Sequence, residues 1–382
     1  MIDCRSAPDA KNTVVSGGRG GETHAATPST IAQANLPPKL DAVARRHQVF
    51  LMLHKAIRRM AIGIGLVFAV VTVTFLLINL APGDPARLWV APGATEAELA
   101  SAREALGLDR PLPVRYATWL TDFARGNWGT SLAQQRPVSS IIRDALPHTL
   151  LLSGGSLALT YVLGILIGAF QAAKRRTRWD TTLTVGSLIV FGMPAYWIAI
   201  MLVLTFAYAS ARYGWPAWLQ FPAMGVASLD ADFLTPWGQL VDRVRHLTLP
   251  LITLSLIGIA GTSRFVRGAV LETRSHAFVH AARARGLSWP VIEGRYVIRN
   301  ALVPVITLLG LSLPALFSGT VFVEVIFAWP GMGREIVTAV TARDYPVVLA
   351  TTAIFAVLVV GGNLLADLLY AVADPRMRED ER

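Results

Sequence analysis

The chain has 382 residues, of which 53% are hydrophobic and 16% charged, whereas a typical soluble domain carries about 25% charged residues. The net charge of +10 does not indicate nucleic-acid binding, because the basic excess lies in short loops beside apolar segments, where it orients membrane proteins. Cys4 is the single cysteine, which excludes an internal disulfide framework and a cysteine-rich metal site. The apolar runs are continuous and about 20 residues long, so they predict membrane-spanning helices and exclude a β-barrel.

The first 51 residues mix Gly, Ser, Thr, Pro and charge without periodicity, which predicts a disordered N-terminal extension. We expect translation to start at Met52, which opens a short basic segment directly before the first apolar run. The intact mass of the native protein would decide this. A transmembrane domain is predicted over residues 52–378, with spans at about residues 60–80, 149–172, 182–209, 247–263, 301–327 and 347–371. Basic residues before the first span and after the second and fourth place both termini in the cytoplasm.

The segment between the first two spans, residues 81–147, is predicted to be folded and to lie outside. Its seven arginines are balanced by seven acidic residues. Thr95 and Glu98 have the spacing of a capping box, and Gly107 would end the helix that follows. An aromatic stripe at helical spacing is expected to pack on the protein's own surface or at the membrane interface, with direct substrate contact as the alternative. Its members are Tyr116, Trp119, Leu120 and Phe123.

The loop of residues 264–300 contains seven arginines and two glutamates, and this excess places it in the cytoplasm. Gly286 can adopt the left-handed conformation that ends a helix, and Ser288 can cap the next one. Small residues on one helical face would let another surface approach closely. They are Ala277, Ala281 and Ala284. From these residues alone, the loop is either a docking segment or a basic loop that only sets topology.

Three polar residues are predicted at membrane depth, namely Glu324 near the outer end of the fifth span and Asn363 and Asp367 in the sixth. Such groups indicate either a translocation path or hydrogen bonds between helices, and Asp367 has pairing with a basic group as a further alternative. Helix hinges are a weaker hypothesis, since proline and glycine are common in membrane helices. The hinge candidates are Pro194, Pro304, Pro314, Gly361 and Gly362. The seven scattered histidines offer no metal site or catalytic constellation, which disfavours a membrane-bound enzyme.

Residues 281–304, AARARGLSWPVIEGRYVIRNALVP, resemble the cytoplasmic "EAA" loop of permease subunits of binding-protein-dependent ABC importers. The resemblance is to the dipeptide, oligopeptide and nickel branch in particular, and it runs from about Met52 to Arg378. His280 departs from the pattern by standing where the loop's name has Glu, and we interpret it as an ordinary surface histidine. The other matching motifs are LAPGDP (80–85), LGLDRPLPVRY (106–116), FARGNWGTSL (123–132), HLTLP (246–250), FAWPGMGR (327–334), RDYPVV (343–348) and DLLYAVADPR (367–376).

The resemblance implies an all-α integral membrane protein with the type I permease fold of ABC importers. Its six helices would have both termini in the cytoplasm and a structured periplasmic segment between helices 1 and 2. The loop would form the coupling helix, which sits in a cleft of the ATPase subunit, and Ala281, Ala282 and Gly286 fall where the family has Ala, Ala and Gly. The predicted coupling residues are Ala277, Ala281, Ala282, Arg283, Arg285 and Gly286.

The resemblance also implies the location and the partners of the chain. It would lie in the inner membrane with a second, homologous permease, two ATP-binding subunits and a periplasmic or extracellular substrate-binding protein, and without nucleic acid or cofactor. The sequence contains no GxxxxGK[ST] loop, so ATP would be handled by another subunit. Peptides are the expected substrate, with nickel or another small solute as the alternative. An ion-coupled secondary transporter is the alternative of a different class, and it would show inverted repeats and buried ionisable pairs.

Overall fold

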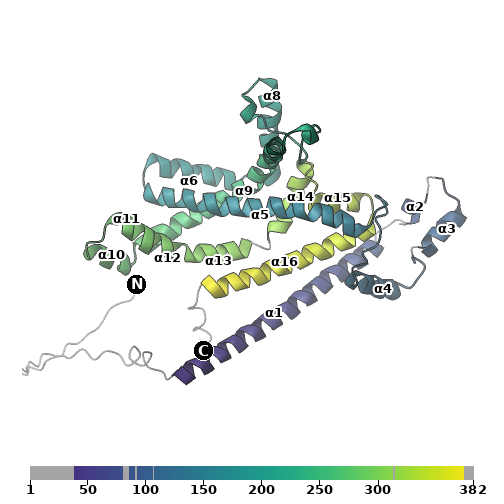
Figure 1. Cartoon of the computed structure of the whole chain (residues 1–382), viewed down its shortest axis with the longest axis horizontal. Helices are drawn as coiled ribbons and strands as arrows, with labels where there is room; N and C mark the ends of the chain where they lie inside the picture. Colours follow the sequence, from purple (N-terminus) through teal and green to yellow (C-terminus); the bar gives the residue numbers. More distant parts are fainter. Residues whose placement is uncertain (1–37, 81–85, 91–92, 106, 313–314, 374–382) are drawn as a thin grey trace, which may run out of the picture. The chain divides into compact units, whose positions relative to one another are not determined.

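The computed structural model describes residues 38–80, 86–90, 93–105, 107–312 and 315–373, and these residues are almost entirely helical (Figure 1). The chain divides into two units, with the boundary between Ile57 and Arg58. Helix α1 (Pro38–Leu80) begins in the first unit and continues into the second. Within the predicted N-terminal extension, the structure describes residues 38–51, which are helical as part of α1. Residues 1–37 lie outside the described residues.

The second unit is built around three long helices, α5 (Val138–Ala173), α9 (Pro236–Arg274) and α16 (Tyr345–Ala373). Shorter helices connect them. Those before α9 are α2 (Ala86–Trp89), α3 (Glu96–Ala105), α4 (Leu112–Ala124), α6 (Arg178–Phe191), α7 (Ala195–Leu202), η1 (Val203–Ala209), α8 (Ser210–Arg212), η2 (Ala217–Leu219) and η3 (Ala231–Phe233). Those after α9 are α10 (Ala277–Ala284), α11 (Trp289–Val291), η4 (Ile292–Ile298), α12 (Arg299–Ala301), α13 (Val303–Ser312), α14 (Ala315–Ile326) and α15 (Met332–Thr341).

Within the described ranges, six helical segments are long and apolar enough to cross a membrane, which confirms the predicted number. They are Ile57–Leu80, Val138–Ala173, Ala195–Arg212, Pro236–Arg274, Trp289–Ser312 and Tyr345–Asp367. The first, second, fourth and sixth contain or overlap the predicted spans. The third and the fifth differ from the prediction.

The third span was predicted over residues 182–209 as one interrupted helix, and the interruption proves to separate two helices. Helix α6 ends at Phe191, and α7 begins at Ala195 after Pro194, whose backbone is extended with φ −65° and ψ 138°. Proline lacks an amide hydrogen and disfavours helical conformation in the residue before it, so the chain breaks here. The candidate span is therefore Ala195–Arg212, and α6 is a separate helix that packs on α9.

The fifth span was predicted over residues 301–327, and the structure shifts it towards the N-terminus. The candidate span is Trp289–Ser312, and α13 ends two residues before Pro314. The downstream part of the predicted span forms a separate helix, α14. Hydropathy alone joins these apolar segments, because it sums side chains over a window and does not register where a helix ends.

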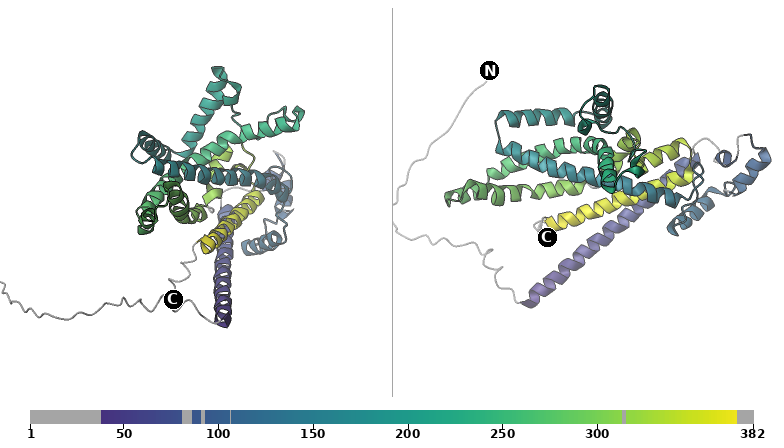
Figure 2. Two further views of the ribbon diagram at one scale, coloured as in Figure 1. Left: turned by 60° about the vertical axis from the view of Figure 1, so that its left-hand side comes forward. Right: turned by 45° about the horizontal axis from the view of Figure 1, so that its top comes forward.

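Helices α5 and α9 lie side by side over much of their length, as both Figure 1 and Figure 2 show. Glycines on α5 allow this approach. A Cβ atom at Gly168 would lie 2.4 Å from the carbonyl oxygen of Ser263, and one at Gly164 would lie 2.7 Å from the side chain of Thr262. Small residues four positions apart are a common way for membrane helices to bring their backbones together.

The capping box predicted at Thr95 and Glu98 is confirmed at the start of α3. The Thr95 amide donates to Glu98 Oε2 at 2.7 Å, and the Glu98 amide donates to Thr95 Oγ1 at 3.4 Å. The bonds from the Thr95 amide and then its hydroxyl hold the pKa of Glu98 below its ordinary value. Each residue thus satisfies an amide that the first turn of a helix leaves without an intrahelical partner.

The aromatic stripe of α4 packs on α1, which confirms that it contacts the protein's own surface. The Tyr116 ring lies 5.1 Å from Phe75, and its hydroxyl lies 2.5 Å from Thr72 Oγ1. Trp119 stacks on Phe123 at 5.3 Å between ring centroids. Aromatic pairs at these distances stabilise beyond the area they bury, so the stripe holds the segment before α5 against α1.

Candidate functional site

The arginine-rich loop of residues 264–300 is folded against the protein. It comprises the end of α9, the short helix α10, α11 and the π-helical turn η4. Apolar side chains of α10 and η4 belong to a buried cluster that also includes Ala172 at the end of α5 and Val266 and Val270 of α9. The cluster members from α10 and η4 are Val279, Ala282, Ile292 and Val297. The position of α10 is therefore fixed by burial of apolar side chains, as expected for an amphipathic helix.

Helix α10 presents its alanines outward. Ala277, Ala281 and Ala284 are exposed, as their spacing predicted. Ala282, by contrast, is fully buried, three residues after buried Val279 on the inward face. Of the predicted coupling residues, Ala282 thus packs the helix onto its own chain, whereas the others remain exposed. The exposed members are Ala277, Ala281, Arg283, Arg285 and Gly286.

Gly286 ends α10 in the left-handed conformation, with φ 79°, as predicted. Its amide donates to the carbonyl of Arg283 at 2.9 Å, and the amide of Leu287 donates to that of Ala282 at 3.4 Å. These two bonds are those of a Schellman motif. Ser288 stands at the cap position of α11 as predicted, but its side chain makes no capping hydrogen bond.

Arg274, the last residue of α9, joins the loop to the end of α5. Its guanidinium donates to the carbonyl of Ala172 at 2.6 Å and forms two bonds to the Glu293 carboxylate, at 3.1 Å and 2.5 Å. It also lies 5.6 Å from the centre of the Trp289 ring. One side chain therefore connects α5, α9, α11 and η4, whereas in the sequence it is distinguished only as part of the basic excess.

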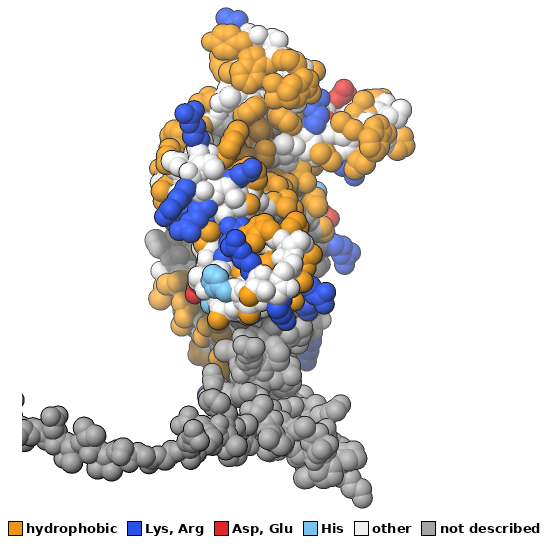
Figure 3. All heavy atoms as spheres, turned by 90° about the vertical axis from the view of Figure 1, so that its left-hand side faces the viewer, with side chains coloured by type: hydrophobic (Ala, Val, Ile, Leu, Met, Phe, Trp, Pro, Cys, Tyr) orange, Lys and Arg blue, Asp and Glu red, His pale blue; other side chains and the backbone are white. Residues whose placement is uncertain are grey.

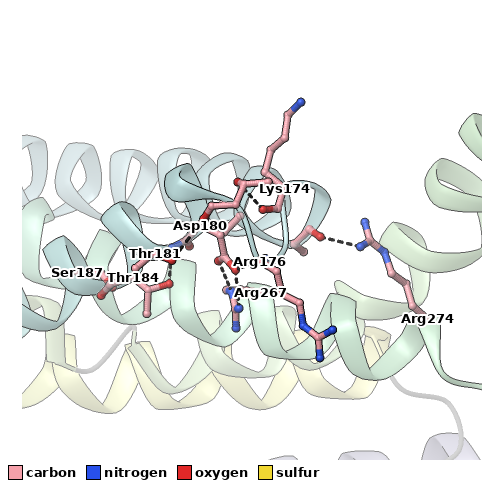
Figure 4. A network of polar contacts seen from close by, with 11 residues as sticks. Lys174, Arg176, Asp180, Thr181, Thr184, Ser187, Arg267 and Arg274 are labelled. Atoms are coloured by element: carbon pink, nitrogen blue, oxygen red, sulfur yellow. Dashed lines mark hydrogen bonds and ion pairs between the residues drawn. The ribbon is translucent and has the colours of Figure 1, made fainter.

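A second connection was also missed, although its signal was present in the sequence. Asp180 is a single acid behind four basic residues at positions 174–178, and it is buried. It accepts two bonds from Arg267 of α9, at 2.7 Å and 2.9 Å, and one from the Arg176 amide at 3.0 Å (Figure 4). The Arg267 guanidinium, followed by the Arg176 amide, lowers the pKa of Asp180 against the opposing effect of burial.

Replacing Asp180 by asparagine is expected to lower the free energy of unfolding by about 1–3 kcal/mol, because Arg267 loses its charged acceptor. The lowered pKa gives this stabilisation a pH dependence. It is fully present above the ordinary carboxyl value of 3.8 and is lost as the pH falls through the lowered pKa. Melting temperatures of the purified variant and the parent between pH 3 and pH 8 measure the difference.

Asp109→Asn is the matched control, because Asp109 is exposed and the charge change is identical. This control is expected to change stability by less than about 0.5 kcal/mol. If both variants melt alike at neutral pH, the Asp180–Arg267 pair does not stabilise the protein.

The end of the molecule that carries α10 and α11 is basic. Figure 3 looks onto this end and shows Lys and Arg side chains gathered over it. We call the following set of exposed residues the basic end: Lys174, Arg175, Arg176, Arg178, Arg283, Arg285, Arg295 and Arg299. The two connections made by Arg267 and Arg274 bring its two chain segments together.

Glu324 is fully buried, and its carboxylate is occupied by its own chain. It accepts from Thr149 Oγ1 of α5 at 2.8 Å and from the amides of Gly333 and Arg334 at 2.6 Å and 3.1 Å. These amides belong to the first turn of α15, where a carboxylate is favoured by unpaired N–H groups and the helix dipole. Of the two alternatives that the sequence allows for Glu324, a translocation path and hydrogen bonds between helices, this arrangement matches the second.

The two polar residues predicted in the sixth span have different surroundings. Asp367 of α16 forms an ion pair with Arg59 of α1, which matches the alternative of pairing with a basic group. Asn363 lies one turn earlier on α16, and its side chain is exposed. The structure therefore does not bring Glu324, Asn363 and Asp367 together into one site.

Asp344, which no local sequence pattern distinguishes, joins two of the quoted motifs. It is buried at the start of α16 and accepts from the amides of Leu132 and Ala133, both at 3.1 Å, and from the hydroxyl of Ser131. Ser131 and Leu132 belong to FARGNWGTSL, and Asp344 to RDYPVV. A carboxylate that accepts several backbone N–H bonds holds a turn in place, which fixes the segment before α5 to α16.

Comparisons with known proteins place the chain in a family. The model of the binding-protein-dependent transport system inner membrane component matches residues 164–379, and the N-terminal model of such membrane components matches residues 52–153. Among solved structures, a chain of an amino acid ABC transporter aligns with 61% of this chain and 94% of its own length, at 16% identity and a TM-score of 0.46.

Three relatives are similar over nearly their whole lengths. The oligopeptide transport system permease protein AppB of Bacillus subtilis is 37% identical over 84% of this chain and 98% of its own. The di/tripeptide transport system permease protein DppB of Pseudomonas aeruginosa is 35% identical over 86% and 99%. The probable D,D-dipeptide transport system permease protein DdpB of Escherichia coli is 36% identical over 84% and 96%.

The six candidate spans and the folded basic loop define a polytopic α-helical membrane protein. The chain belongs to the family of inner membrane components of binding-protein-dependent transport systems. It is therefore a multi-pass permease of the inner membrane that works with ATP-binding subunits and a substrate-binding protein.

Proposed function

We propose that this chain is one of two homologous permease subunits that together enclose the path of an ATP-driven peptide importer. The observation that carries this proposal is helix α10. It is fixed by its buried face and by a Schellman motif, and it presents an exposed row of alanines at the basic end. A short helix with small outward side chains can be approached closely by a partner surface. In this proposal the basic end lies in the cytoplasm, as the positive-inside rule requires.

This orientation assigns a role to each end of the second unit. Both termini would be cytoplasmic, and the segment of residues 81–147, held on α1 by the α4 stripe, would lie outside, where the substrate-binding protein delivers its cargo. ATP hydrolysis would take place on the partner subunits, since the sequence has no P-loop. Exposed Ala277, Ala281, Arg283, Arg285 and Gly286 would meet those subunits.

The mechanism would be alternating access driven by movement of α10. ATP binding closes the ATP-binding subunits, and α10 moves with them. Arg274 and the buried cluster connect α10 to the ends of α5 and α9, so the displacement passes into the membrane helices. A ligand shifts the equilibrium between two conformations only by as much as it favours one of them. Here the ATP-bound partner subunits supply that preference.

The substrate is proposed to be a peptide. Support comes from the relatives, which are named for oligopeptides, di/tripeptides and D,D-dipeptides, and these names favour peptides over nickel. Within the chain, exposed Asn363 on α16 is the residue that we place on the path, whereas Asp367 and Glu324 hold helices together. Specificity would lie largely with the binding protein.

The proposal is tested with the affinity-tagged chain purified together with its partner subunits and reconstituted in liposomes. Binding-protein-dependent and ATP-dependent uptake of labelled di- and oligopeptides is expected. Gly286→Val should abolish uptake or release the ATP-binding subunits, because a β-branched residue at φ 79° is strained. The strain costs on the order of 1–2 kcal/mol, which alters the end of α10 without unfolding the protein.

Gly294→Val is the matched control. Gly294 lies on the same loop, its added side chain would also enter open space, and its φ is not positive. Normal uptake is expected from this control. Normal uptake and normal retention of ATP-binding subunits in Gly286→Val would contradict docking through α10. Uptake by the chain alone, driven by an ion gradient, would instead establish a secondary transporter.

A further inference from the structure

A pocket of about 360 Å³ opens beside α10 and is lined by Arg283, Leu287, Trp289 and Ile292. It lies directly after the Schellman motif, at the sharp break between α10 and α11. Three of its four lining side chains are apolar, and the fourth is a guanidinium. The pocket is thus separate from the exposed alanine row but close to it along the chain.

The apolar walls are held in place by interactions that extend into the core. Ile292 is 1% exposed and belongs to the buried cluster, and Leu287 packs against the same cluster. Trp289 is about half exposed, and its ring is held by the Arg274 guanidinium, which Glu293 and the Ala172 carbonyl fix in turn. A pocket with such fixed walls needs little ordering on binding, which favours affinity.

The charge of the pocket is not balanced by its own loop. Within the described part of the chain, Glu293 is engaged by Arg274, and no ion pair to Arg283 is found. Glu272, the other acid of the loop, is exposed at the end of α9. Arg283 is exposed and lines the pocket, so a complementary occupant carries a carboxylate next to an apolar group.

We propose that this pocket receives an apolar side chain with a neighbouring carboxylate from the ATP-binding subunit, an inference that rests on the proposed docking of α10. Continuity with the exposed alanine row favours this partner, because Arg283 lies between Ala281 and Ala284 on α10 and also lines the pocket. A buried apolar anchor beside a desolvated charge pair is the usual composition of a binding hot spot. Anionic lipid headgroups, by contrast, would interact with any exposed arginine of the basic end alike.

The test compares Arg283→Glu with Arg295→Glu in the full complex. Both arginines are exposed on the same loop and both changes alter the net charge equally, but only Arg283 lines the pocket. The measurement is the amount of ATP-binding subunit retained by the tagged chain across a salt series. Arg283→Glu is expected to weaken retention at least about tenfold and Arg295→Glu less than about twofold, because only the former places like charges in a buried contact.

Arg283→Ala and Trp289→Ala are second variants in case charge reversal prevents folding, and each is expected to weaken retention as well. Equal effects of Arg283→Glu and Arg295→Glu would overturn the proposal in favour of general electrostatic attraction. Binding of the purified chain to phosphatidylglycerol vesicles is measured in parallel. If the Arg283 variants lose vesicle binding and keep their ATP-binding subunits, the pocket is a lipid site and the proposal is wrong.

Ala281→Trp separates this inference from the proposed function. It obstructs the alanine row without touching the pocket lining. If Ala281→Trp loses the ATP-binding subunits while the Arg283 variants keep them, docking through α10 stands and the pocket proposal falls. If neither change affects retention, docking through α10 itself is wrong.

Discussion

Replacing Glu324 by alanine is expected to lower the free energy of unfolding by at least about 3 kcal/mol, because three donors around this buried carboxylate then lose their acceptor, at about 1–3 kcal/mol each. The donors are the Thr149 hydroxyl and the amides of Gly333 and Arg334. Typical proteins are stable by only about 5–15 kcal/mol, so the variant should show a sharply reduced yield of folded protein. The measurement is the monodisperse fraction in size-exclusion chromatography of detergent extracts, together with the melting temperature.

Glu335→Ala is the control on the neighbouring helix. The Glu335 side chain accepts one bond from the exposed Gln134 side chain, and its loss is expected to change stability by less than about 0.5 kcal/mol. The stability of Glu324→Gln should fall between those of the two alanine variants. Its side-chain amide keeps one acceptor oxygen, but its NH2 group then faces groups that are themselves donors. Equal yields and melting temperatures for the two alanine variants would show that the Glu324 bonds do not hold α14, α15 and α5 together.

A single methyl group at Gly168 is expected to disrupt the contact between α5 and α9. Its Cβ atom would lie 2.4 Å from the Ser263 carbonyl oxygen and 2.7 Å from Val266 Cβ, and backbone at such a distance cannot move without separating the helices. Overpacking of this kind costs about 1–3 kcal/mol. Gly168→Ala should therefore lower the melting temperature, and peptide uptake should fall with it, because α5 carries the connections to the basic end.

Gly154→Ala adds the same methyl group to the same helix where no atom lies within 4 Å. Alanine is the better helix former by about 0.5–1 kcal/mol, so this control should be neutral or slightly stabilising. The difference between the two variants isolates close packing from helix propensity. If Gly168→Ala is as stable as Gly154→Ala, close approach of α5 and α9 is not required.

Local patterns predicted the features that depend on neighbouring residues. The capping box at Thr95, the left-handed Gly286, the exposed alanines of α10 and the self-packing stripe at Tyr116 each depend on a few consecutive positions. Their physical causes, which are backbone donors, φ restrictions and helical periodicity, act over one or two turns. The six-span count succeeded for a related reason, since a membrane requires about 20 apolar residues in a row.

The features that the sequence did not reveal depend on partners far away in the chain. Arg267 reaches Asp180, and Ser131 reaches Asp344 across more than two hundred positions. No local periodicity records such pairs. The sequence indicates that Glu324 is a polar group at membrane depth. Whether it lines a translocation path or holds helices together depends on its hydrogen-bond partners, which lie on α5 and α15. The third and fifth candidate spans differ from the predicted ones because hydropathy does not register where a helix ends, as at Phe191 and at Ser312.

The side chain of Arg274 has a geometric consequence for how far a small docking movement can reach. Its guanidinium binds α5 at the last turn, and α5 is 36 residues long, or roughly 54 Å at 1.5 Å per residue, with Pro147 inside it. A rod of that length tilted by roughly 10° about one end sweeps its far end through about 9 Å. Because α5 and α9 are closely packed, the two helices would move together as one rigid body. A small displacement at the basic end that tilts α5 would thus become a larger displacement at the opposite end of this helix.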